Sequence, residues 1–79
     1  MKHYRYTIVL HPEPEEGGYS VTVPALSGCF TQGETVEECI ERAKEAIALH
    51  IEGLITHGLL VPEGDEVPVI TIDVDAPAA

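Results

Sequence analysis

Apolar and polar residues alternate in two stretches near the start of the chain, residues 4–11 and 19–23. Strict alternation predicts β-strands that bury one face. The segment between them, residues 12–18, is acidic and rich in proline and glycine, and it predicts an antiparallel hairpin with a loose loop. Residues 29–32 then predict a short third strand ending at Gly33. The face expected to be buried carries Tyr4, Tyr6, Ile8, Leu10, Tyr19, Val21 and Val23.

After Gly33 the apolar residues recur every three or four positions, as they do on one face of a helix. Thr35 and Glu38 have the spacing of a capping box, in which the hydroxyl accepts from a free amide and the glutamate reaches back. Gly58 can adopt a left-handed cap conformation, so we expect a helix from about Val36 to about His57. The stripe expected to face the sheet comprises Val36, Ile40, Ala43, Ile47, Leu54 and Ile55.

Residues 68–75 alternate again and predict a last strand on which Ile70, Ile72 and Val74 share the face toward the helix. A helix between two strands usually returns the second strand parallel to the first, through a right-handed crossover. The expected fold class is therefore α+β: a two-layer β-β-β-α-β sandwich with one helix on one face of a mostly antiparallel sheet. No helix is expected on the other face, whose candidates for self-association are Thr7, Val9 and Thr22.

The chain has 79 residues, with four Lys and Arg against fourteen Asp and Glu, and a formal net charge of −10. With so few basic residues we expect no direct binding to nucleic acid or to an anionic membrane. The length favours a single domain over residues 1–79, and so small a core gains stability from a partner subunit, so we expect a dimer or tetramer. The start lacks a signal-peptide pattern, so we expect a cytoplasmic protein with Cys29 and Cys39 as free thiols.

Residues 19–38 resemble the signature of the HicB-like antitoxins. They contain a strand that ends in Val-Pro, a turn that ends in Gly-Cys, a Thr-Gln-Gly step, and the acidic helix start capped by Thr35. The β-β-β-α-β order also fits that family's partial ribonuclease-H-like fold. Many members continue into an operator-binding domain, whereas this sequence stops shortly after the predicted last strand. We therefore expect no C-terminal DNA-binding domain.

The resemblance implies a non-enzymatic protein that binds and neutralises HicA, a small basic toxin that cleaves messenger RNA. The acidic charge agrees with such a partner, because complementary charge speeds association. The exposed side of the predicted helix supplies the candidate toxin contacts Glu37, Glu41 and Glu45. An alternative is an orphan of the same fold that has no toxin and serves as an oligomeric interaction or ligand-binding module.

A second alternative is a metal-dependent nuclease that uses Asp73 and Asp75. Acidic residues on strands of a ribonuclease-H-like fold can hold the magnesium ions of such an enzyme. The first strand offers no further acid, which favours solvated charges at a strand end. His50 and His57 would lie about 10.5 Å apart along a helix, too far to share a metal ion. Cys29 has no neighbouring cation to activate its thiol. We therefore expect no catalytic residues, no metal site and no cofactor.

Overall fold

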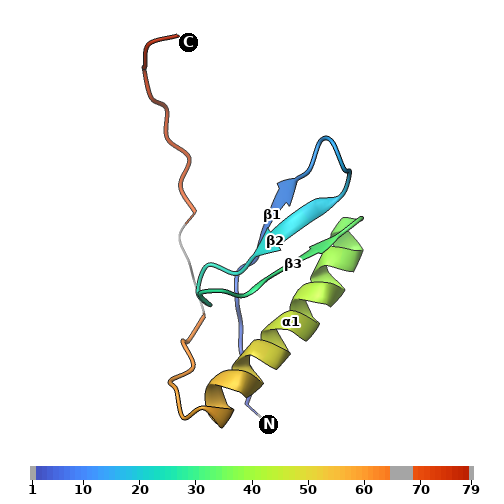
Figure 1. Ribbon diagram of the computed structural model, residues 1–79. Coiled ribbons are helices and arrows are strands. Elements are labelled where there is room, and N and C mark those ends of the chain that lie inside the picture. The colour runs from blue at the N-terminus through green and yellow to red at the C-terminus, as the bar shows by residue number, and fades with distance from the viewer. Residues whose placement is uncertain (1, 65–68, 79) are drawn as a thin grey trace.

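Three strands followed by one helix are the regular elements of the computed structural model, which describes residues 2–64 and 69–78. The strands form one antiparallel sheet in the order β1-β2-β3, and the helix lies across one face of it (Figure 1). The α+β class and the antiparallel order of the first three strands are thereby confirmed. The elements are β1 (Val9–Pro12), β2 (Tyr19–Thr22), β3 (Phe30–Gly33) and α1 (Val36–Thr56).

The strand register gives the sheet an inner and an outer face. Val21 at the centre of β2 pairs with Leu10 of β1 and is completely buried beneath α1. The neighbouring residue Thr22 pairs with Val9 and with Phe30, and successive side chains of a strand point to opposite faces. Val9, Thr22 and Phe30 therefore share the outer face, away from the helix.

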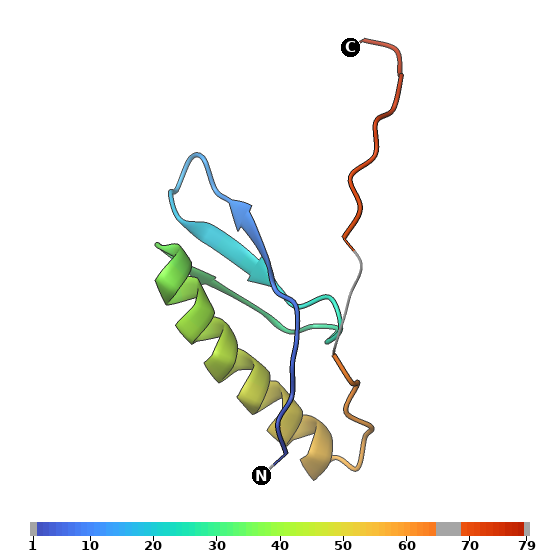
Figure 2. The same cartoon turned by 180° about the vertical axis from the view of Figure 1, so that it is seen from behind.

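β1 begins at Val9, five residues later than the sequence pattern predicted. The reason lies just after β2, where Pro24 cannot donate to a ladder and the chain turns at once. Residues 2–8 run on alongside α1 without a paired strand in the described part of the chain (Figure 2). Tyr6 and Ile8 nevertheless pack against the buried core, so the predicted inward face is confirmed for these two residues.

Both ends of α1 are capped by local hydrogen bonds. The Thr35 hydroxyl accepts from the Glu38 amide at 3.1 Å, and a Glu38 carboxylate oxygen accepts from the amide of Glu34 at 2.8 Å. The reciprocal bond of the capping box thus reaches one residue further upstream than expected. At the other end Gly58 has a φ of +68° and its amide donates to the carbonyl of Ile55 at 3.0 Å, which closes the helix.

The core lies between the inner sheet face and α1, and its buried residues form two adjoining clusters. Close packing depends on Gly33, because a Cβ there would lie 2.9 Å from both the amide nitrogen and the Sγ of Cys39. The helix consequently buries Cys39 and Ala43 most deeply, while Ile40, expected to face the sheet, is 40% exposed. The buried residues are Val21, Val23, Leu26, Cys29, Cys39, Ala43 and Ile51.

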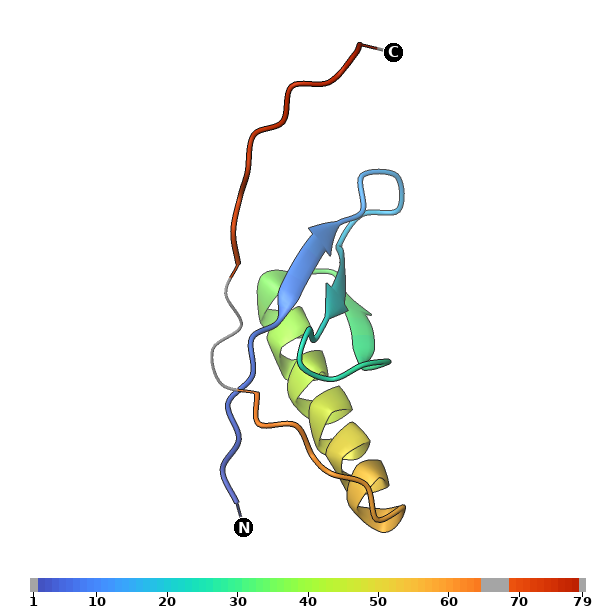
Figure 3. The ribbon, with the colours of Figure 1, turned by 90° about the vertical axis from the view of Figure 1, so that its left-hand side faces the viewer.

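The predicted last strand is not formed, and this part of the predicted fold is wrong for the single chain. Residues 69–75 have no ladder partner and lead away from the sheet and the helix (Figures 1 and 3), while residue 68 lies outside the described residues. Ile70, Ile72 and Val74 are 78%, 73% and 73% exposed. A strand needs a neighbouring backbone to satisfy its polar groups, so alternation alone does not create one.

Candidate functional site

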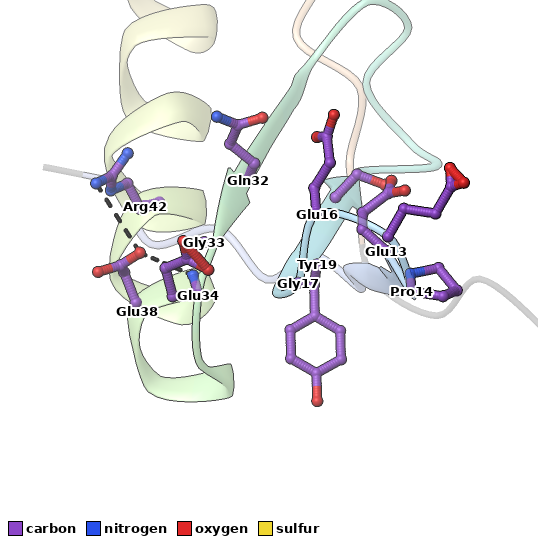
Figure 4. A pocket seen from close by; sticks show the side chains of 12 residues that line it. Glu13, Pro14, Glu16, Gly17, Tyr19, Gln32, Gly33, Glu34, Glu38 and Arg42 are labelled. Carbon is purple, nitrogen blue, oxygen red and sulfur yellow. Dashed lines mark hydrogen bonds and ion pairs between the residues drawn. The ribbon is translucent and has the colours of Figure 1, made fainter.

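Carboxylates from two separate parts of the chain surround a hollow beside the start of α1 (Figure 4). One group belongs to the loop between β1 and β2, and the other belongs to the junction between β3 and α1. Among the described residues that line the hollow, Arg42 is the only cation. The lining glutamates are Glu13, Glu15, Glu16, Glu34 and Glu38.

The sheet register brings these two acidic groups together, because Tyr19 at the start of β2 pairs with Gly33 at the end of β3. Gly18 permits this approach: it has a φ of +71°, and a Cβ there would lie 2.6 Å from the carbonyl oxygen of Gly33. Sequence reasoning missed the hollow because it treated the acidic loop as a mere connection. The available signal was the acidic run ahead of β2, together with Glu34 just before the helix cap.

The toxin contacts predicted from the sequence lie on α1 next to this hollow. Glu37, Glu41 and Glu45 are all exposed. Glu41 follows Glu38 of the hollow by three residues, and Glu45 follows Glu41 by four, so these side chains are neighbours on one side of the helix. We call the hollow together with these three helix glutamates the acidic surface.

Two basic side chains of α1 pair with this surface without neutralising it. Arg42 Nη2 lies 3.9 Å from Glu38 Oε1, and Lys44 Nζ lies 4.0 Å from Glu41 Oε1. Each pair is solvent-exposed and long, and exposed ion pairs contribute at most about 1 kcal/mol. The surface therefore keeps a strong excess of negative charge.

The outer sheet face holds two of the three predicted self-association residues in register. Val9 and Thr22 are paired across β1 and β2, whereas Thr7 precedes the first residue of β1. The Thr22 hydroxyl lies 3.1 Å from Nε2 of His11, which is itself exposed. Sequence reasoning missed Phe30, which pairs with Thr22 and is 72% exposed, although alternation within β3 could have placed it there.

Among the residues it describes, the structure places no activating group at the thiol that the sequence analysis considered, that of Cys29. Cys29 and Cys39 are free and buried, and burial raises the pKa of the Cys29 thiol, which keeps the sulfur protonated. His57 Nδ1 lies 2.8 Å from the carbonyl oxygen of Gly53 and donates to it, which serves the helix end.

Residues 2–64 and 69–78 contain no cluster of metal ligands: no three His, Cys, Asp or Glu side chains in these ranges are placed to share an ion. Asp73 and Asp75, the candidates for a nuclease, are exposed in the segment that leads away from the sheet. Within the same described ranges, no helix is long and apolar enough to cross a bilayer.

The fold and its surface define a small α+β protein that carries a strongly acidic surface. Comparison with protein families assigns it more narrowly. The model of the HicB-like antitoxins of bacterial toxin–antitoxin systems matches residues 6–76. The chain therefore belongs to the HicB-like antitoxin family, as its motifs indicated.

Several curated relatives align over most of the chain. A UPF0150 protein of Thermoplasma acidophilum is 44% identical over 68 residues, which cover 86% of this chain and 96% of the relative. A UPF0150 protein of Synechocystis is 47% identical over 62 residues, which cover 78% of this chain and 77% of that protein. Antitoxin HicB of Escherichia coli is 40% identical over 58 residues, which cover 73% of this chain but 41% of the antitoxin.

Proposed function

We propose that this chain is an antitoxin domain that binds and neutralises a small basic HicA-type toxin. The observation that carries the proposal is the acidic surface, in which eight glutamates gather beside the start of α1 in a chain of net charge −10. Membership in the HicB-like family supports the nature of the partner.

The acidic surface acts in two ways in this proposal. Its negative potential draws a basic protein toward it and raises the association rate, since complementary charges steer diffusional encounter. Once bound, the domain covers the basic surface that the toxin needs to hold the RNA backbone. Both effects are properties of binding and need no chemical step by the antitoxin.

Surface plasmon resonance against a catalytically inactive toxin tests this proposal. Raising the salt concentration from about 0.05 to about 0.5 M shortens the screening length from roughly 14 to roughly 4 Å, so association should slow strongly while dissociation changes little. The double variant Glu41→Lys/Glu45→Lys should associate slowly even at low salt. Because both residues are exposed, the variant should remain folded.

A charge-matched control separates a local contact from the effect of net charge. The double variant Asp73→Lys/Asp75→Lys changes the net charge equally, and both residues are exposed in the segment that leads away from the sheet, outside the acidic surface. It should slow association less than the Glu41/Glu45 reversal. If both double variants bind with the same rate and the same salt slope, the acidic surface is ordinary solvated surface.

The orphan alternative makes a different prediction for the same experiment. An interaction module without a toxin binds no basic HicA-type protein at any salt concentration. Absence of a gene for such a protein beside the gene for this chain would favour the orphan module, and its presence would favour the antitoxin.

A further inference from the structure

The acidic surface consists mainly of carboxylates, which speed the approach of a basic partner but do not by themselves hold it. Exposed ion pairs contribute little, because solvent screens them. The buried core of a lasting protein interface is more apolar than its rim, and a few anchoring side chains there carry most of the binding energy. The antitoxin proposed above therefore needs an apolar anchor within reach of its glutamates.

Charge separates the candidates for such an anchor. Among the described residues of the three strands and α1, the large apolar side chains that are more than 60% exposed are Phe30, Leu49 and Ile55. Ile55 lines an apolar groove between residues 2–8 and α1, whose lining contains three of the chain's four basic residues against one carboxylate, so the groove does not attract a basic partner. Phe30 stands on the outer sheet face, away from α1 and beside the uncharged Thr22.

Leu49 lies on the side of α1 that carries the helix glutamates of the acidic surface. It follows Glu45 by four residues and precedes Glu52 by three, so the three side chains are neighbours on the helix. All three are exposed, Leu49 to 70%. An apolar side chain thus stands at the edge of the acidic surface, about one helical turn beyond Glu45.

Gly53 adds a second observation, because it lies one further turn along α1 from Leu49. A glycine inside a helix is destabilising relative to alanine. Neither the backbone nor the packing of the described residues requires it here: its φ is not positive, and a Cβ would meet nothing within 4 Å. A partner that comes close to the helix backbone would require it, because a missing side chain permits such an approach.

We propose that Leu49 is the apolar anchor of the toxin contact and that Gly53 admits the toxin close to the backbone of α1. The toxin then presents a basic patch to the acidic surface and, next to it, an apolar depression that receives Leu49. This inference rests on the proposed function and deepens it. The glutamates set the association rate, whereas Leu49 and Gly53 set the dissociation rate.

Surface plasmon resonance against the same catalytically inactive HicA-type toxin separates the two contributions. Leu49→Ala should raise the dissociation rate about tenfold or more, as truncation of an interface anchor does, and should leave the association rate and its salt dependence unchanged. Ile55→Ala is the matched control, since it truncates a similarly exposed side chain of α1 outside the acidic surface, and it should dissociate as the parent chain does. An equal effect of the two variants, or a larger effect of Phe30→Ala, would overturn the assignment.

Gly53→Gln gives folding and binding opposite signs. Glutamine is a better helix former than glycine and its Cβ meets nothing, so the midpoint of thermal unfolding should rise. The same side chain would stand between the helix backbone and the toxin, so the affinity for the toxin should fall about tenfold. Ala48→Gln, which is exposed on the groove side of α1, is the control and should bind as the parent chain does. A Gly53→Gln variant that binds as tightly as the parent would refute the close approach.

Failure of this inference differs from failure of the proposed function. If the parent chain binds the toxin and both Leu49→Ala and Gly53→Gln bind equally well, the antitoxin function stands and the anchor is refuted. If the parent chain binds no toxin, both fall. A lower mass of Leu49→Ala in light scattering, with unchanged dissociation from the toxin, would show that a second copy covers Leu49 and would also overturn the proposal.

Discussion

The hydroxyl of Tyr6 donates a hydrogen bond of 2.7 Å to the carbonyl oxygen of Pro62 and so joins the start of the chain to the loop after α1. Lys2 adds an exposed ion pair with Glu63 at 3.1 Å beside it. The two contacts hold the loop against residues 2–8, which have no paired strand there in the described part of the chain.

Removal of that hydroxyl gives the first prediction. Tyr6→Phe should lower the free energy of unfolding by about 1 kcal/mol, the net contribution of a typical intramolecular hydrogen bond. Urea denaturation followed by circular dichroism measures the change. Tyr19→Phe is the control, because the Tyr19 hydroxyl makes no side-chain hydrogen bond among the described residues. Equal stability of the two variants would show that the Pro62 contact contributes nothing.

Alkaline pH should destabilise the fold. Burial raises the pKa of the Cys29 thiol, and burial followed by the nearby Tyr4 raises the pKa of the Tyr6 hydroxyl. Both groups bind protons more tightly when folded, so their contribution is fully present below the ordinary pKa of a thiol, about 8.5, and is lost as the pH rises through the raised values. Denaturation at pH 7 and pH 10 should show the loss, and Cys29→Ala should make it smaller.

A pair of glycine variants tests the close approach of β3 to α1. Gly33→Ala should destabilise the fold by about 1–3 kcal/mol, because its Cβ would meet the backbone and the sulfur of Cys39. Gly53→Ala should instead stabilise it by up to about 1 kcal/mol, since Gly53 lies within α1 with open space around its Cβ position. Thermal unfolding measures both, and a Gly33→Ala midpoint at or above the parent value would contradict the packing argument.

We also propose that the outer sheet face associates, as its half-buried Val9 and its exposed Thr22 and Phe30 suggest. Val9→Glu should lower the mass of the assembly, because like carboxylates would meet across a symmetric contact. Analytical ultracentrifugation measures the mass. Gln32→Glu offers a control on the same face, at the far strand. The same substitution at Thr7 tests whether the contact extends ahead of the first residue of β1. An unchanged mass for Val9→Glu would exclude this face.

Local signals predicted the helix and the hairpin well. Thr35 and Gly58 mark the helix ends through hydrogen bonds to near neighbours in the sequence, so no tertiary information was needed. The length of β1 depended on where Pro24 ends its partner strand, which the β1 sequence does not contain.

The acidic hollow and the last strand escaped prediction for related reasons. The hollow depends on the pairing of Tyr19 with Gly33, a register that joins glutamates distant in the sequence. Residues 69–75 have the alternation of a strand, but a strand also requires a neighbour, and alternation carries no information about which backbone supplies it.

The order of the strands has a kinetic consequence. Each strand pairs with the next strand along the chain, and α1 follows β3 directly, so residues 9–56 need few long loop closures and should fold rapidly at a rate independent of protein concentration. The proposed association of the outer sheet face is bimolecular and proceeds at a rate set by encounters between chains. Refolding should therefore show a fast phase that forms the helix and a slower phase whose rate rises with protein concentration. The rate of the first phase is set by the topology of the chain, and the rate of the second is set by the abundance of the protein.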